Sequence, residues 1–190
     1  NGHLVYLIGN DDSHDVSDIT DIATRFTMIN ADENEAEKIL SSLENGNAVG
    51  VDFPIIYDET LEQKIKRLKK NLPHITQVEL KDDTLLVSAS KPISKIRFIG
   101  QEGKELKTQK NIKTGTYAIQ PEDNYVRCEL KFKDGTTLYL NPITRHENNE
   151  ITKQRLDHIN YPKTIILWTV YLSIISFAAY RIIKRLRNRR

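Results

Sequence analysis

The residues best suited to chemistry lie near the start of the chain, in the stretch GNDDSHD at residues 9–15. Asp12 and His14 stand two positions apart and follow the apolar run at residues 4–9, which we predict to be a buried strand. A carboxylate and an imidazole at this spacing can direct one oxygen and one nitrogen to a single divalent ion. Catalytic metal sites need three or more protein ligands, so these two residues form only part of such a site. A solvated acidic loop is the alternative interpretation.

The other residues of catalytic type carry weaker signals. Ser13, His14 and the flanking aspartates are the residue types of a hydrolase triad, but neighbouring side chains rarely converge in the required line. Cys128 is the only cysteine, which excludes an internal disulfide, and its alternating apolar neighbours predict a place in a core. The remaining histidines have no ligand-like spacing and are expected at the surface or in structural roles: His3, His74, His146 and His158.

A strand–helix–strand–helix pattern follows the acidic loop. Residues 25–31 alternate apolar and polar side chains and predict a strand, and residues 48–52 predict another. Between them we expect a helix with Asp32 as its N-cap, Glu35 at the capping-box position and Gly46 as its stop. Residues 59–72 predict a second helix with Leu61, Ile65, Leu68 and Leu72 inward, a lysine-rich outer face and Pro73 at its end.

The pattern changes to short alternating runs between residues 78 and 142. Turn signals separate these runs, which is typical of an antiparallel β-sandwich. Asp134-Gly135 suits a tight hairpin turn, and Lys113-Thr114-Gly115 is one of the other predicted turns. The polar residues 146–160 predict a linker or a short surface helix. One run alternates clearly enough to predict core residues: Val126, Cys128, Leu130 and Phe132.

The C-terminal segment predicts a membrane anchor. Seventeen residues from Thr164 to Tyr180 carry no charge, and the apolar stretch continues past Arg181 to Ile183. A helix of about twenty residues spans the hydrocarbon core of a bilayer, so the lipid bilayer is the expected partner of this segment. The basic tail at residues 184–190 should stay in the cytoplasm, which places the folded body in the periplasm or outside the cell.

The charge is segregated along the chain. Residues 1–162 carry 21 Lys and Arg against 26 Asp and Glu, whereas the last 28 residues carry seven Lys and Arg and no acid. A mildly acidic body argues against nucleic acid as a partner, because phosphate binding requires positive charge on the folded face.

Two stretches resemble a known family. LIGNDDSHD, followed by a strand, a helix and SLENGNAVGV, is similar to the C-terminal end of the PHP (polymerase and histidinol phosphatase) family of metal-dependent phosphoesterases, whose last metal motif is Asp-x-His. YVRCELKFKDGTTLYLNPITR resembles the β-sandwich that follows the barrel in one branch of that family. The resemblance covers residues 1–146. It implies that Asp12 and His14 are ligands of divalent ions (Zn, Mn or Fe) and that the substrate is a phosphorylated small molecule.

The family's earlier motifs, including a His-x-His, are absent from this sequence, and about 74 residues cannot close its barrel. We therefore expect an α+β chain that is the C-terminal part of a membrane-anchored phosphoesterase and is inactive by itself. The alternative is a non-catalytic, membrane-anchored surface protein with a β-sandwich domain, in which a degenerate barrel remnant is used for binding. The expected organisation is a C-terminal fragment of a PHP-type (β/α) barrel (1–74), a β-sandwich (75–146), a linker (147–163), a transmembrane helix (164–183) and a basic tail (184–190).

Overall fold

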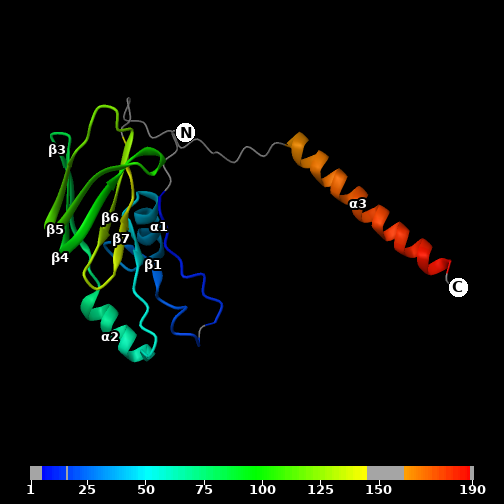
Figure 1. Ribbon diagram of the computed structural model, residues 1–190, viewed down its shortest axis with the longest axis horizontal. Helices are drawn as coiled ribbons and strands as arrows, with labels where there is room; N and C mark the ends of the chain where they lie inside the picture. The colour runs from blue at the N-terminus through cyan, green and yellow to red at the C-terminus, as the bar shows by residue number, and fades with distance from the viewer. Residues whose placement is uncertain (1–5, 16, 145–160, 189–190) are drawn as a thin grey trace. The chain divides into compact units, whose positions relative to one another are not determined.

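The computed structural model describes residues 6–15, 17–144 and 161–188. The chain divides into two compact units, residues 1–151 and 152–190 (Figure 1). In the described residues the first unit contains all the strands and two of the α-helices, and helix α3 forms the second unit. The elements are β1 (Arg25–Ile29), α1 (Ala36–Glu44), β2 (Ala48–Asp52), α2 (Leu61–Asn71), β3 (Ile75–Lys81), β4 (Thr84–Ile99), η1 (Gln101–Gly103), β5 (Glu105–Ala118), β6 (Tyr125–Lys131), β7 (Thr137–Leu140), β8 (Ile143–Thr144) and α3 (Tyr161–Arg187).

One curled antiparallel sheet organises the first unit. Its strands follow the order β1-β2-β7-β6-β4-β3, while β5 pairs with β4 and β8 pairs with β6. Strand β4 has 16 residues and explains the curl, because its first part pairs with β3 and its last part with β6. Strand β5 follows β4 along both parts, with a shift of register between Ser88 and Ile93. The sheet therefore bends into a half-barrel (Figure 1).

Long strands replace two of the predicted breaks. Two of the short alternating runs predicted between residues 78 and 142, which begin at Thr84 and Lys95, belong to the single strand β4, and the turn predicted at Lys113-Thr114-Gly115 lies inside β5. Gly115 is needed there for close packing, because a Cβ atom would lie 2.6 Å from Cδ1 of Ile96. The predicted turn at Asp134-Gly135 is confirmed between β6 and β7, where Gly135 has a φ of +94°.

The hydrophobic core is built mainly from strands β2, β4, β5, β6 and β7. The predicted core positions Val126, Cys128, Leu130 and Phe132 are confirmed, since none is more than 3% exposed. Burial of each large apolar side chain contributes about 1.5–3 kcal/mol to folding. The rest of the core comes from strands β2, β4, β5 and β7 and from the residue after β2: Val51, Phe53, Leu85, Val87, Ile93, Ile96, Phe98, Tyr117, Leu138 and Leu140.

The sheet differs from the predicted barrel fragment and sandwich. Strands β1 and β2 are joined by a helix yet pair antiparallel, whereas a (β/α) barrel requires parallel strands. Strand β2 also pairs with β7, with Val51 opposite Leu138, so one sheet crosses the boundary predicted near residue 74. An alternating apolar face indicates a half-buried strand but does not specify its neighbours, which is why the sequence did not predict the pairing of β2 with β1 and β7.

Helix α2 carries the main departure from the predicted amphipathic pattern. Its N-terminus has a capping box between Thr60 and Gln63, and Leu68 and Leu72 pack on the core as predicted. Leu61 and Ile65, however, are 46% and 43% exposed, and the buried residue of the helix is a lysine, Lys64.

Helix α1 begins later than predicted. Its N-cap is Glu35, which makes no side-chain capping hydrogen bond, so the predicted cap at Asp32 is wrong. The predicted stop is confirmed, because Gly46 adopts a φ of +73° and its N–H donates to the carbonyl oxygen of Leu43.

Residues 6–9 are not the predicted buried strand, and Leu4 and Val5 lie outside the described residues. Leu7 and Ile8 are exposed, and side chains rather than a strand ladder hold this segment. The Leu7 N–H donates to Oδ1 of Asn141 at 2.7 Å, and the Gly9 N–H donates to Oγ1 of Thr27 at 2.8 Å. A Cβ atom on Gly9 would lie 2.5 Å from the Phe26 carbonyl oxygen, so the segment passes directly against β1.

Helix α3 forms the second unit and is long and apolar enough to cross a membrane. Its 27 residues contain the uncharged run from Thr164 to Tyr180, and its last turn contains Lys184, Arg185 and Arg187. These features are consistent with a single-pass membrane protein. The linker predicted at residues 146–160 lies outside the described residues.

Candidate functional site

The acidic loop between residues 9 and 25 is closed by Asp11. Its carboxylate accepts hydrogen bonds from the N–H groups of Ala23 (2.5 Å), Thr24 (2.8 Å) and Arg25, and from the Thr24 hydroxyl at 2.8 Å. Partial burial acts to raise the pKa of Asp11, but these hydrogen bonds outweigh it and hold the pKa below its usual value. Asp11 therefore ties the start of the loop to the start of β1.

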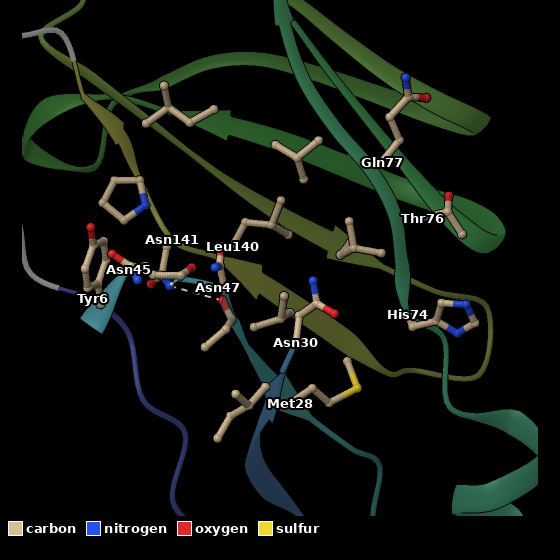
Figure 2. A pocket seen from close by; sticks show the side chains of 18 residues that line it. Tyr6, Met28, Asn30, Asn45, Asn47, His74, Thr76, Gln77, Leu140 and Asn141 are labelled. Atoms are coloured by element: carbon tan, nitrogen blue, oxygen red, sulfur yellow. Dashed lines mark hydrogen bonds between the residues drawn. The ribbon is translucent and has the colours of Figure 1, made fainter. Parts of the chain in front are cut away.

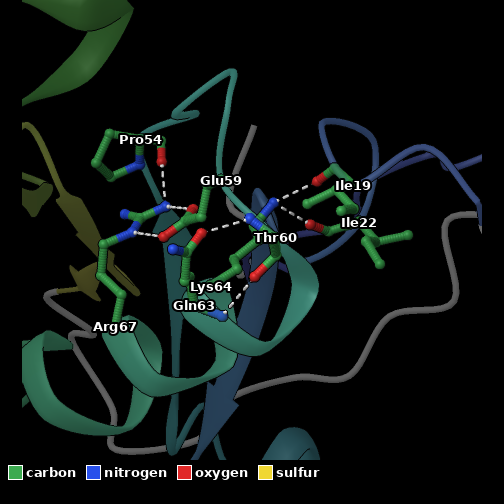
Figure 3. Close-up of polar contacts among 8 residues, drawn as sticks. All are labelled: Ile19, Ile22, Pro54, Glu59, Thr60, Gln63, Lys64 and Arg67. Carbon is green, nitrogen blue, oxygen red and sulfur yellow. Dashed lines mark hydrogen bonds and ion pairs between the residues drawn. The ribbon is translucent and has the colours of Figure 1, made fainter.

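Lys64 of α2 holds the middle of the same loop. Its ammonium donates to the carbonyl oxygens of Ile19 (2.6 Å) and Ile22 (2.5 Å), as Figure 3 shows. Lys64 is only 2% exposed, and burial followed by the nearby charge of Arg67 lowers its pKa. The buried ammonium is tolerated because main-chain carbonyl oxygens accept hydrogen bonds from it.

Arg67 fixes helix α2 to the end of β2. Its guanidinium donates to both carboxylate oxygens of Glu59 at 2.7 Å and to the Pro54 carbonyl oxygen at 3.0 Å (Figure 3). The same group lies 4.1 Å from the centre of the Phe53 ring, in the core. A continuous set of contacts thus runs from the core through Arg67 and α2 to Lys64 and the loop.

Two further aspartates build turns within the loop. Asp15 accepts from the N–H and hydroxyl of Ser17 at 2.8 and 2.6 Å, and Asp18 accepts from the same groups of Thr20 at 2.8 and 2.7 Å. The hydroxyl and backbone hydrogen bonds lower the pKa of both carboxyl groups. Asp11, Asp15 and Asp18 are therefore acceptors for the loop's own backbone.

The predicted ligands Asp12 and His14 have a different environment. Both are exposed, and Asp12 has a φ of +54°, with its N–H donating to Oδ1 of Asn10 at 3.1 Å. Neither side chain has a hydrogen-bond or ion-pair partner among the residues that the structure describes. Their donor atoms, a carboxylate oxygen and an imidazole nitrogen, suit Zn, Mn or Fe. Within the described ranges, however, no group of three or more His, Cys, Asp or Glu could hold an ion.

A separate cavity of about 680 Å³ opens between the β1–β2–β7 part of the sheet and β3. Figure 2 shows Tyr6, Asn45 and Asn141 on one side of it and His74 on the other. Asn141 is a structural residue, because its amide donates to the carbonyl oxygens of Gly46 and Ala48. Several other polar side chains line the cavity: Asn30, Asn47, Thr76 and Gln77.

Sequence reasoning did not identify Asp11, Lys64 or Arg67. A signal existed for Lys64, which lies three residues after Leu61 and four before Leu68 and so shares their side of the helix. Its charge nevertheless suggested an outward position. The cavity had no signal at all, because its lining comes from segments distant in sequence.

Comparisons with protein-family models, with curated proteins and with solved structures found no match.

Proposed function

We propose that this chain is the membrane-anchored, C-terminal part of a metal-dependent phosphoesterase of the PHP type, with Asp12 and His14 as two of its metal ligands. The observation that supports this proposal best is that the acidic loop contains two kinds of side chain, those that hold its backbone and those that are exposed. Asp11, Asp15 and Asp18 accept hydrogen bonds from the loop's backbone, whereas the two side chains of the Asp-x-His motif remain exposed and available.

Residues of this chain would have distinct roles in the proposed site. Asp12 would contribute an anionic oxygen and His14 a neutral nitrogen, while Asp11 and Lys64 hold their loop. A divalent ion in such a site polarises a phosphoryl oxygen and lowers the pKa of a bound water. The proposed site requires further ligands besides these two, since two ligands do not make a catalytic site.

The proposal also includes an orientation for the anchor. Arg181 and the basic last turn of α3 oppose translocation, so the C-terminus would lie in the cytoplasm and the sheet in the periplasm or outside the cell. The substrate would then be a phosphorylated small molecule on that outer side.

Paramagnetic Mn²⁺ offers a site-specific test on the full chain in detergent micelles. Nuclear magnetic resonance signals of residues 10–15 should broaden first, and Asp12→Asn or His14→Ala should each reduce that broadening. Asp58→Asn is the matched control, because Asp58 is an exposed aspartate outside the loop. Equal broadening in wild type and both loop variants would contradict the proposal.

A non-catalytic surface binding protein is the second candidate, and the polar cavity is the observation that favours it. Its amide groups suit a neutral, hydrogen-bonding ligand rather than a phosphate. Chemical-shift changes at Asn30, Asn47 and Gln77 on titration with neutral sugars, without Mn²⁺ broadening at residues 10–15, would favour this candidate over the phosphoesterase.

A further inference from the structure

We propose that Lys64 is a positioning residue, which holds the acidic loop on α2 so that Asp12 and His14 are presented in one arrangement. The role toward a metal ion rests on the proposed function. The role in ordering the loop rests on the contacts of Lys64 alone.

The contacts of Lys64 are suited to fixing backbone. Two of the three ammonium protons go to main-chain carbonyl oxygens, those of Ile19 and Ile22, which lie 45 and 42 positions away in sequence. A lysine on a solvent-facing helix surface would keep its charge in water, but this one is buried. The interaction therefore links two distant parts of the chain, α2 and the loop.

Lys64 and Asp11 together hold the loop through hydrogen bonds to its backbone at two places. Asp11 binds the N–H groups of residues 23–25, and Lys64 binds the carbonyl groups of residues 19 and 22, so the returning part of the loop is held from both sides. The exposed residues Asp12 and His14 lie directly after Asp11. A loop anchored in this way restricts where their donor atoms can point, and ligand sites depend on such supporting contacts.

Neither methionine nor arginine is expected to reproduce both contacts of Lys64. Methionine has a similar length but no donor, and it would leave the Ile19 and Ile22 carbonyl groups without their ammonium partner. Arginine keeps the charge but carries a larger planar fork that does not match two converging carbonyl groups. We therefore expect Lys64→Met to release the loop and Lys64→Arg to restore it only in part.

Hydrogen–deuterium exchange on the full chain in detergent micelles tests the ordering role. Lys64→Met should speed the exchange of amides in residues 17–25 by about tenfold or more, because a lost buried hydrogen bond typically changes an opening equilibrium by that factor. Amides of β6 in the core should keep their protection. Lys66→Met is the matched control, since Lys66 is an exposed lysine of the same helix, and it should leave the loop unchanged.

Mn²⁺ titration of the same variants tests the positioning role. Broadening at residues 10–15 should require about 10-fold more Mn²⁺ in Lys64→Met than in Lys66→Met. Unchanged exchange at residues 17–25 in Lys64→Met would overturn the inference. If Lys64→Met loses the protection of β6 as well, Lys64→Arg decides the question. Loop exchange and a Mn²⁺ response in Lys64→Arg equal to those of wild type would then overturn the inference. A wild-type chain that binds no Mn²⁺ would refute the proposed function, while the exchange result would still decide whether Lys64 orders the loop.

Discussion

Two kinds of side chain share the acidic loop between residues 9 and 25. Asp11, Asp15 and Asp18 accept hydrogen bonds from nearby backbone and hydroxyl groups, whereas Asp12 and His14 are exposed. The sequence predicts the polar character of this loop and its candidate ligands. It does not distinguish Asp11 from Asp12, because that distinction depends on where three N–H groups at residues 23–25 point in the folded chain.

The neighbouring aspartates provide a matched pair for a stability test. Asp11→Asn should lower the free energy of unfolding by about 1–2 kcal/mol, because it removes charge-assisted hydrogen bonds to three N–H groups. Asp12→Asn should change it by less than about 0.5 kcal/mol, since asparagine also tolerates a positive φ. Urea unfolding of the full chain in micelles, followed by circular dichroism, measures both. Equal effects of the two changes would contradict the assigned roles.

The same pair predicts a pH dependence. The native pKa of Asp11 lies below its unfolded value near 3.8, so the unfolded chain binds more protons in acid and stability decreases as the pH falls. The contribution of Asp11 is present above pH 4 and disappears as the pH falls through the native pKa. The stability difference between wild type and Asp11→Asn should therefore shrink below pH 4, as urea unfolding at several pH values would show. A difference that stays constant from pH 7 to pH 3 would contradict this assignment.

At the scale of secondary structure, local sequence patterns predicted those strands and helices that can be recognised without knowing which segments they pair with or pack against. β1, β2 and α2 lie within two or three residues of their predicted limits, because alternation and helical periodicity are local properties. The predicted start of α1 and the prediction of a buried strand at residues 6–9 were wrong. An apolar run such as residues 4–9 indicates burial, but this segment is held by the side chains of Asn141 and Thr27, which local sequence does not show.

Strand β6 and its hairpin give the clearest prediction for the core. Phe132→Ala should lower the free energy of unfolding by about 3–5 kcal/mol, because Phe132 is 3% exposed and its removal leaves a cavity. Lys131→Ala is the control, since Lys131 is the exposed neighbour at the end of β6 and should have little effect. The denaturation midpoints of the two variants provide the comparison. A midpoint unchanged by Phe132→Ala would mean that the side chain lies at the surface.

At the scale of the whole molecule, the chain combines a curled sheet with an apolar helix. The sequence predicted both the β-rich body and the helix, since composition and length are enough for each. It did not predict that strands on both sides of residue 74 share one sheet. Strand pairing between β2 and β7 joins residues nearly 90 positions apart, and no local pattern specifies such a contact.

The proposed orientation of the anchor is testable in cells. External protease should digest the body and spare a tag placed after Arg190, because the cations of the tail oppose translocation. Intact cells serve for this measurement, or spheroplasts where an outer membrane is present. A cytoplasmic marker protein that stays intact is the control for leakage. Recovery of the tagged chain in the soluble fraction, or removal of the tag by external protease, would refute the orientation.

Strand β5 has one further consequence, which concerns encounters between copies of the molecule. Among the described strands it pairs only with β4, so the backbone on its other side has no strand partner there and could template fibril growth. Lys107, Lys110 and Lys113 are exposed along this strand, and Asn111 interrupts its regular conformation with a φ of +54°. An incoming strand would have to desolvate these ammonium groups and match the irregular backbone. This edge is thereby protected against self-association, which matters for a protein that a membrane anchor would concentrate at a surface.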